Sequence, residues 1–445
     1  MIQAIAGVST RIVQRWLPDA FLFSIILTAI VFFSGMISQG QTPAAMVQYW
    51  GDGIWNLLTF SMQVMITLVT GHVLAQSKPV HAFLRKAAGI AHTPNQAIML
   101  MTVVGLVGCW LNWGFGLIAG AFFAREIAGR VKGVHYPLLV ASAYSGIVVW
   151  HAGLSGTIPL KVAMADGNAL GELMGGPIPV GDTIFSGPVL AMCAIVLVTL
   201  PLLNRLMMPP AHEVIELEDP HAMDNAISDG KDYDGTEGRT PAEKIENSRL
   251  LALFLAGLGG WYLVDYFVSG GKLNLNSLNL SFFVVGILCH GTPARYLHAI
   301  NDAIKGTAGI VLQFPLYAGI MGMVVKSGLA TAISSWFVSI STATTFPLFT
   351  FISAGLVNMF VPSGGGQWAV QAPIVIPAAQ SLGVPLEQVS MAVAMGDAWT
   401  NMAQPFWALP LLAIAGLGIR DIMGYCVIAL FWTGLVFGTG LILFY

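Results

Sequence analysis

The sequence predicts an all-α polytopic membrane protein made of two inverted-topology repeats. Its 445 residues are 56% hydrophobic and 9% charged, whereas a soluble protein has about 25% charged residues. Apolar stretches long enough to cross a bilayer recur along the whole chain. Two further apolar stretches are interrupted near their middle by glycines. A chain with so few charges must be surrounded mostly by lipid.

Transmembrane helices are expected wherever about 20 apolar residues follow one another. These stretches are Ala20–Ile37, Ile54–Leu74, Pro137–Ala163, Phe185–Met208, Leu250–Val268, Leu278–Cys289 with an extension to about Leu297, Thr307–Val325, Val389–Gly416 and Ile422–Tyr445. Two of them, 137–163 and 389–416, are longer than one crossing needs. They carry "HAGLSGT" (151–157) and "TNMAQP" (400–405) in mid-span. We therefore expect both to be broken transmembrane helices, because proline and glycine disfavour a continuous helix.

The two interrupted stretches, 95–125 and 346–381, are predicted to be re-entrant helical hairpins. Each has arms of about 15 residues, too short to cross the bilayer at about 1.5 Å per residue. Their tips are "NWGFG" (112–116) and "PSGGG" (362–366). In the second hairpin we expect Pro362 to end one arm, the three glycines to reverse the chain, and the second arm to start near Gln367.

The distribution of lysine and arginine predicts how these helices are oriented in the membrane, since cytoplasmic loops are enriched in both. With the N-terminus in the cytoplasm, all of the 19 basic residues except Lys161, Lys272 and Lys326 fall on the cytoplasmic side. The first hairpin then enters from the cytoplasm, and the second from the opposite face. The C-terminus is predicted to be periplasmic.

The chain is predicted to divide at a polar segment. Residues 1–208 form the first repeat, 209–248 a cytoplasmic linker, 249–277 a linking transmembrane helix, and 278–445 the second repeat. The linker holds 11 of the 22 acidic residues and is expected to be a solvated connection. The sequences "GLVGCWLNWGFG" and "GLVNMFVPSGGG" stand at matching places in the two repeats. Inverted repeats with broken helices are typical of secondary transporters.

The broken helices and the hairpin tips predict a binding site for a small anion. Irregular backbone at membrane depth survives only where it is buried in protein or lines a cavity. Its free N–H groups, at the positive end of a helix dipole, can bind an anion. We expect this to happen without a lysine or arginine, since no expected span has a basic residue near its centre. The candidate substrate-binding residues are Asn112, Trp113, Gly114, His151, Ser363, Gly364, Gly365, Gly366, Gln367, Trp368, Asn401 and Gln404.

Asp397 is the candidate for coupling to an ion, because it is the carboxylate that lies well inside an expected span. A carboxylate in the membrane is costly and usually functional; the alternative is a satisfied structural hydrogen bond. His151 has three interpretations: a core histidine, a pocket residue or a proton relay. No metal site or cofactor is expected, apart from a coupling H⁺ or Na⁺, because the four cysteines form no C-x-x-C pair.

Several motifs resemble the bacterial short-chain fatty acid transporter family, which belongs to the ion transporter superfamily. They are "WGDGIWNLL" (50–58), "NWGFGLIAGAFFARE" (112–126), "VPSGGGQW" (361–368) and "NMAQPFWALP" (401–410) followed by "GLGIRDIMGYC". The resemblance runs along nearly the whole chain. It implies uptake of butyrate- or acetoacetate-like monocarboxylates across the bacterial inner membrane.

The resemblance also implies cation symport, an elevator-type mechanism and a homodimer. The asparagine-threonine signatures that relatives in the superfamily place at hairpin tips are replaced here by "NWGFG" and "PSGGGQ". The sodium sites of those relatives are therefore not carried over to this chain.

Other functions compete with this interpretation. A transporter of dicarboxylates or amino acids would have the same architecture, and a channel is also conceivable. An intramembrane serine hydrolase is a remote alternative, suggested by "GLSG" (153–156). No H-E-x-x-H or Walker A motif occurs, which disfavours a metalloprotease or an ATP-driven pump. No enzymatic activity and no nucleic-acid partner are expected.

Overall fold

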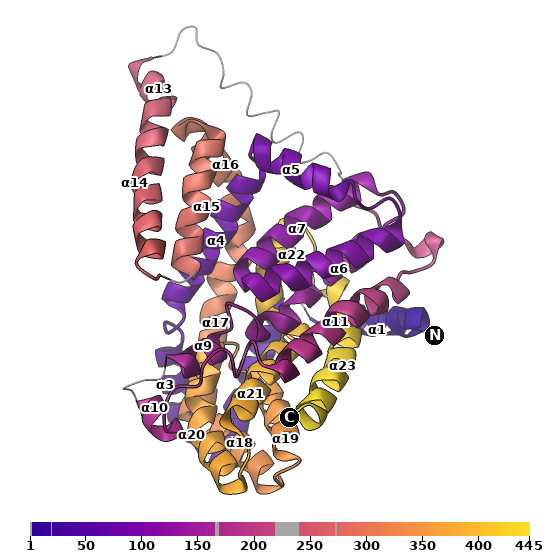
Figure 1. The fold of residues 1–445 in the computed structure, drawn as a ribbon, viewed down its shortest axis with the longest axis vertical. Coiled ribbons are helices and arrows are strands. Elements are labelled where there is room, and N and C mark those ends of the chain that lie inside the picture. Colours follow the sequence, from indigo (N-terminus) through magenta and orange to yellow (C-terminus); the bar gives the residue numbers. More distant parts are fainter. Residues whose placement is uncertain (1, 19, 165–168, 219–239, 272–273) are drawn as a thin grey trace.

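The structure is a computed structural model that describes residues 2–18, 20–164, 169–218, 240–271 and 274–445. The described residues contain helices and no strand (Figure 1). The prediction of an all-α membrane protein is therefore confirmed. Most of the predicted linker, residues 219–239, lies outside the described residues.

The first part of the chain is a series of helices that ends where the linker begins. Its elements are α1 (Ile2–Trp16), α2 (Ala20–Gln39), α3 (Pro43–Gly53), α4 (Leu58–Ala75), α5 (Lys78–Ala88), α6 (Pro94–Leu111), α7 (Trp113–Arg130), α8 (Tyr136–Tyr144), η1 (Ser145–Ala152), α9 (Thr157–Ala163), α10 (Ala169–Met174), α11 (Gly187–Leu206) and η2 (Ala211–Glu213).

The second part follows the linker. Its elements are α13 (Pro241–Glu246), α14 (Arg249–Val268), α15 (Leu275–His290), α16 (Pro293–Ala303), η4 (Ile304–Thr307), α17 (Ala308–Lys326), α18 (Leu329–Ser339), α19 (Phe346–Asn358), α20 (Gly364–Leu382), α21 (Leu386–Thr400), η5 (Asn401–Ala403), η6 (Phe406–Ala408), α22 (Leu409–Ala415) and α23 (Ile419–Leu443).

Threonine-proline pairs begin several of these helices. In α3, α6 and α16 the threonine hydroxyl accepts a hydrogen bond from the backbone N–H three residues later, and proline occupies the first helical position. The hydroxyl satisfies one of the donors that a helix start leaves free, and proline has no N–H to satisfy. These starts are therefore fixed by local sequence.

Seven helical stretches are long and apolar enough to cross a membrane among the described residues. They are Phe21–Gln39, Leu58–Ala75, Pro94–Leu111, Tyr136–Ala163, Gly187–Leu206, Arg249–Val268 and Ile419–Leu443. Helices α17 and α18 pass the same test as a pair bent by 56°. The expected extension of the span at 278–289 to about Leu297 is wrong. Helix α15 ends at His290, because Gly291 adopts a left-handed conformation with φ +77° and Pro293 begins α16.

The apolar stretches 95–125 and 346–381 each form two packed helices. Helix α6 has 18 residues and is long enough to cross a membrane, so the expected arm length of about 15 residues is wrong for the first hairpin. Helices α6 and α7 are separated by one non-helical residue, Asn112. Near this turn a Cβ added at Gly108 would lie 3.0 Å from the Gly116 Cα atom, so the two helices meet backbone to backbone. Helices α19 and α20 are separated by residues 359–363.

The long stretches 137–163 and 389–416 are both interrupted. The first consists of α8, η1 and α9, with residues 153–156 outside any helix. The second consists of α21, η5, η6 and α22, with Gln404 and Pro405 between the two short 3₁₀ turns. The helix breaks therefore lie at "GLSG" and "QP", inside the polar segments that the sequence singles out.

The core lies where the interrupted helices cross the hairpins. Helix α6 packs against η1, α19 packs against α21, and α7 packs against α22. In the most apolar part of the stretch 136–163, 89% of the residues are buried inside the protein, against 17% in α14. The interrupted stretch is thus central, whereas α14 is peripheral (Figure 1).

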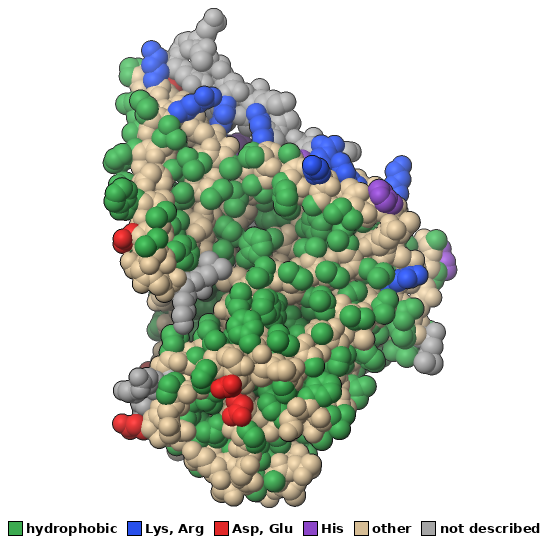
Figure 2. Space-filling view, viewed as in Figure 1, with side chains coloured by type: hydrophobic (Ala, Val, Ile, Leu, Met, Phe, Trp, Pro, Cys, Tyr) green, Lys and Arg blue, Asp and Glu red, His purple; other side chains and the backbone are tan. Residues whose placement is uncertain are grey.

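A second, smaller hydrophobic cluster joins α4, α14, α15 and α16. It is separate from the main core that surrounds the hairpins. Figure 2 shows Lys and Arg side chains gathered along the upper edge, at the level of α5 and α13, and apolar side chains over the broad middle of this face. This distribution is typical of a membrane protein with one basic face.

Candidate functional site

A cavity of about 510 Å³ opens where the two hairpin tips and the first broken helix meet. Its lining comes from α4, from the tips at Asn112 and Ser363, from the segment between η1 and α9, and from the start of α15. The lining residues are Phe60, Gln63, Asn112, Trp113, Trp150, Ser155, Thr157, Leu160, Lys161, Met164, Asn274, Leu275, Asn276, Ser363, Gly364, Gly365 and Trp407. The volume is in the range of small-molecule sites.

Asn112 and Ser363 have the same local role at the two tips. The Asn112 side chain accepts a hydrogen bond from the Phe115 N–H at 3.0 Å and caps α7. The Ser363 hydroxyl accepts from the Gly366 N–H at 3.4 Å and caps α20. Each cap occupies one of the donors that a helix start leaves free.

The two helix starts differ in the donors that remain. At α7, the Trp113 N–H also donates a hydrogen bond, to the Ser155 hydroxyl at 3.1 Å. At α20, the N–H groups of Gly364 and Gly365 have no hydrogen-bond partner among the described residues. Because both glycines line the cavity, α20 presents two free donors at the positive end of its dipole.

The three glycines do not reverse the chain, so the expectation for "PSGGG" is wrong. Helix α20 begins at Gly364 rather than near Gln367, the preceding helix α19 ends at Asn358 rather than at Pro362, and none of the three glycines has a positive φ. At Gly364 there is no room for a side chain, and at Gly365 there is room only if Lys161 moves. A Cβ added at Gly364 would lie 2.5 Å from the His151 Nε2 atom, and one at Gly365 would lie 2.8 Å from the Lys161 Nζ atom.

Lys161 is the residue that sequence reasoning missed. Its Nζ atom donates a hydrogen bond to the Gly365 carbonyl at 3.2 Å, and its side chain lines the cavity. A lysine therefore stands beside the predicted anion site, which the sequence analysis did not expect. Lys161 is one of three basic residues outside the cytoplasmic pattern, and it lies four residues after the polar segment 151–157.

Aromatic rings form one wall of the cavity. Phe60, Trp113, Trp150 and Trp407 all line it and contact one another. The closest pair, Trp113 and Trp407, has ring centroids 4.8 Å apart at 78°. The buried indole N–H groups of Trp150 and Trp407 have no hydrogen-bond partner among the described residues. The wall is therefore apolar.

His151 and Asp397 meet behind this wall. The His151 Nε2 atom lies 3.2 Å from the Asp397 Oδ1 atom, and both side chains are 0% exposed. Neither ring nitrogen and neither carboxylate oxygen forms a hydrogen bond of good geometry with another described group. The Trp150 ring lies over the imidazole, with centroids 3.6 Å apart. The structure thus brings together two residues that the sequence analysis singled out separately.

Several other candidates lie in buried networks away from the cavity. Asn401 accepts hydrogen bonds from Asn358 and Gln404 at 2.9 and 3.0 Å, at the break between α21 and α22. Gln367 donates to the Ala354 carbonyl at 2.8 Å and so holds α20 against α19. The candidates Gly114, Gly366 and Trp368 do not line the cavity either.

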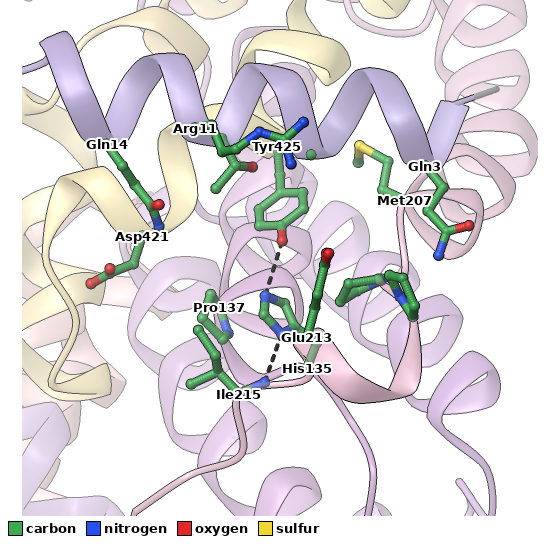
Figure 3. Close-up of a pocket in the computed structure, with 14 residues that line it drawn as sticks. Gln3, Arg11, Gln14, His135, Pro137, Met207, Glu213, Ile215, Asp421 and Tyr425 are labelled. Atoms are coloured by element: carbon green, nitrogen blue, oxygen red, sulfur yellow. Dashed lines mark hydrogen bonds between the residues drawn. The ribbon is translucent and has the colours of Figure 1, made fainter.

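A second cavity, of about 280 Å³, lies between α1, α23 and the chain that enters the linker (Figure 3). His135 stands at its centre. The His135 Nδ1 atom accepts a hydrogen bond from the Ile215 N–H at 3.0 Å, and its Nε2 atom lies 2.9 Å from the Tyr425 hydroxyl oxygen. Burial lowers the pKa of His135 to about 4. His135 is therefore a neutral histidine that fastens the start of the linker to α23.

Proteins of similar sequence are named as transporters. A family model described as "Short chain fatty acid transporter" matches residues 1–444. A protein of Escherichia coli (strain K12), provisionally named a short-chain fatty acid transporter, is 48% identical over 447 residues, with all of both chains covered. A protein of Haemophilus influenzae with the same provisional name is 43% identical over 449 residues, with 99% of each chain covered.

Among solved structures, the YdaH transporter of Alcanivorax borkumensis is 15% identical, with a TM-score of 0.42. The alignment covers 95% of this chain and 98% of that one.

Proposed function

Because the chain belongs to the short chain fatty acid transporter family, we propose that it takes up butyrate- or acetoacetate-like monocarboxylates across the bacterial inner membrane. It is a multi-pass membrane transporter and not an enzyme. The observation that carries the proposal is the cavity in which two free N–H groups, a lysine and an aromatic wall converge. A short fatty acid has a carboxylate and a small alkyl tail, and each part finds a matching surface.

The carboxylate would bind at the start of α20. The N–H groups of Gly364 and Gly365 point from a helix N-terminus, where an anion is favoured by the free donors and the helix dipole. The Lys161 Nζ atom, 3.2 Å from the Gly365 carbonyl, adds a positive charge beside them. Since the Lys161 side chain is exposed, this charge is partly screened and allows the anion to leave.

The alkyl tail would lie against the wall formed by Phe60, Trp113, Trp150 and Trp407. Covering an apolar chain there removes it from water, at about 0.8 kcal/mol for each CH₂ group. The wall therefore favours an acid with a short apolar tail over one with a second charged group.

A dicarboxylate or amino acid transporter of the same architecture is the alternative. A dicarboxylate needs two anion sites, one at each helix start. At α7 the N–H groups of Trp113 and Phe115 are taken by Ser155 and Asn112, and Gly114 does not line the cavity. One open anion site supports a monocarboxylate. The same bond gives Ser155 a capping role, and no described histidine hydrogen-bonds its hydroxyl, which disfavours a serine hydrolase.

Alternating access by an elevator-type motion, symport with H⁺ or Na⁺ and a homodimeric assembly complete the proposal. The separate hydrophobic cluster of α4, α14, α15 and α16 supports a division into a scaffold and a moving unit. The same order of helix, hairpin and broken helix in 1–208 and 278–445 supports two inverted repeats. The distribution of lysine and arginine along the sequence supports a cytoplasmic N-terminus and a periplasmic C-terminus.

Uptake of labelled butyrate into proteoliposomes tests the function, with protein-free liposomes measuring the passive permeation of the protonated acid. We expect saturable, protein-dependent uptake that unlabelled short monocarboxylates inhibit. Inhibition by dicarboxylates or amino acids, with none by short monocarboxylates, would assign the chain to the alternative substrate class. Uptake that does not saturate would indicate a channel.

A further inference from the structure

We propose that the coupling ion is a proton and that the buried pair of His151 and Asp397 binds it, one proton for each monocarboxylate. This inference rests on the proposed function and deepens it, by naming the ion, its site and the stoichiometry. One proton with one monocarboxylate carries no net charge, so a membrane potential alone would not drive uptake.

The pair is isolated from every other hydrogen-bonding group in the described part of the chain. Its two members are 0% exposed and lie 3.2 Å apart, Nε2 to Oδ1, and no other described group hydrogen-bonds their polar side-chain atoms. A buried carboxylate without donors is strongly disfavoured. A single proton changes the net charge of the pair from −1 to 0, whether it is held by the imidazole or by the carboxyl group. The geometry therefore favours proton binding.

Few other charges act on the pair. The elements that pack against η1 and α21 carry Arg125, Glu126, Arg130, Arg205, Glu387, Arg420 and Asp421 in their first or last two turns, and Lys161 at the cavity. The neutral titratable groups on the same elements are Cys109, Tyr136, Tyr144, Cys193, Tyr425 and Cys426. Of these charged side chains, Lys161 is the one that lines the cavity beside Gly364 and Gly365.

Gly364 connects the pair to the substrate site. It lines the cavity with a free N–H, and a Cβ added to it would lie 2.5 Å from the His151 Nε2 atom. A carboxylate bound at this N–H would therefore lie close to the pair. If the pair is unprotonated, two negative charges face each other in a low-dielectric region, where repulsion is strong. Bound proton and bound carboxylate must then favour each other reciprocally.

A sodium ion fits this site less well. Hard cations take oxygen ligands, and the atom that faces the Asp397 Oδ1 is an imidazole nitrogen. The Asn401 side-chain oxygen already accepts hydrogen bonds from Asn358 and Gln404. The buried Gln404 Oε1 and Asn358 Oδ1 atoms have no described hydrogen-bond partner. The preference for a proton therefore rests on the imidazole nitrogen opposite the Asp397 Oδ1.

Proton uptake on substrate binding is the test, because it needs no transport and is unaffected by passive permeation. Purified full-length protein in detergent is titrated with butyrate by calorimetry, at several pH values between 6 and 8, in buffers of different ionisation enthalpy. Butyrate stays ionised there, since aliphatic carboxyls titrate at about pH 4 to 5. We expect binding to take up as much as one proton per butyrate, with Kd rising up to tenfold per pH unit at the alkaline end.

Asp397→Asn and His151→Gln are measured in the same way, each checked for folding by its melting temperature. Both should bind butyrate with less proton uptake than the wild type, and their Kd should depend less on pH. If wild-type protein binds butyrate without taking up protons, or only when Na⁺ replaces choline, the proton inference fails and the proposed function stands. If folded wild-type protein binds no butyrate in either salt, the function and the inference both fail. The wild-type measurement decides between these outcomes even if neither variant folds.

Discussion

Two buried histidines of this protein lie in opposite surroundings. Both nitrogens of His135 are engaged, with the Ile215 N–H at 3.0 Å and the Tyr425 hydroxyl at 2.9 Å (Figure 3). His151 is more deeply buried, but no described group forms a hydrogen bond of good geometry with its ring. It faces the Asp397 carboxylate and the first turn of α20 instead.

The difference teaches that burial alone does not distinguish a structural histidine from a functional one. A satisfied histidine stabilises the fold and has no reason to change its protonation state. A histidine that faces an isolated carboxylate can gain stability when the pair binds one proton. The following predictions test whether the two histidines differ in this way.

The largest effect is expected for His151→Gln. Glutamine keeps the polarity and approximate size of the side chain but cannot take up a proton near neutral pH. We expect accumulation of butyrate above equilibrium to be abolished, because the pair can no longer exchange its proton normally. Uptake into proteoliposomes under an imposed pH gradient measures this. Accumulation equal to that of the wild type would assign His151 to the core, as a histidine of the same kind as His135.

A large effect is also expected for Gly364→Ala. The added methyl would lie 2.5 Å from the His151 Nε2 atom, and such overpacking costs about 1–3 kcal/mol. Because the methyl displaces the donors at the start of α20, we expect butyrate affinity to fall by up to about 150-fold. Gly366→Ala is the matched control in the same helical turn. Its methyl would meet the Ser363 hydroxyl oxygen at 3.5 Å and the Met321 sulfur at 3.6 Å, ordinary contacts. Equal losses in the two variants would contradict the role given to Gly364.

A moderate effect is expected for Lys161→Met, which keeps the length of the side chain and removes its charge. Because the side chain is exposed, the lost attraction is about 1 kcal/mol. The butyrate concentration for half-maximal uptake should rise about fivefold. Lys161→Arg should restore most of the affinity, since it keeps the charge. An unchanged concentration dependence in Lys161→Met would remove the lysine from the site.

The smallest effect on transport is expected for His135→Phe, whose consequence is structural. The change leaves the Ile215 N–H and the Tyr425 hydroxyl without their partner, at a cost of about 1–3 kcal/mol of stability. Because burial lowers the pKa of His135 to about 4, below the ordinary 6.5, the unfolded chain binds the proton first as pH falls. Wild-type stability should therefore fall between about pH 6.5 and pH 4.

Melting temperatures between pH 7.5 and 4.5 check this prediction. The His135→Phe variant should start lower and lack that part of the acid destabilisation. The pH dependence of butyrate binding should be the same as in the wild type. A changed binding profile would mean that His135 also communicates with the substrate site.

Much of the fold could be predicted from the sequence because its signals are local. Apolar length marks the spans, and proline or glycine within them marks the breaks near His151 and Gln404. The end of α15 at Gly291 was missed because its positive φ depends on a turn that hydropathy does not register. Gly364 was misread because a Cβ there would clash with His151, a long-range contact rather than a local turn.

The site was predicted in part for the same reason. His151 and Asp397 each stand out as polar residues in apolar surroundings, but only the packing of η1 against α21 brings them into contact. Lys161 was overlooked because its position beside Gly365 depends on how α9 packs against α20. Gln367 and Asn401 stood out equally well, and the structure gives them partners within the protein.

Two assays of Asp397→Asn, run beside the wild type, test the central claim most directly. One is butyrate accumulation driven by an imposed pH gradient; the other is counterflow, the exchange of labelled for unlabelled butyrate without any gradient. If the buried pair binds the coupling proton, the variant should lose accumulation and keep counterflow. Accumulation at the wild-type level in Asp397→Asn would contradict the account.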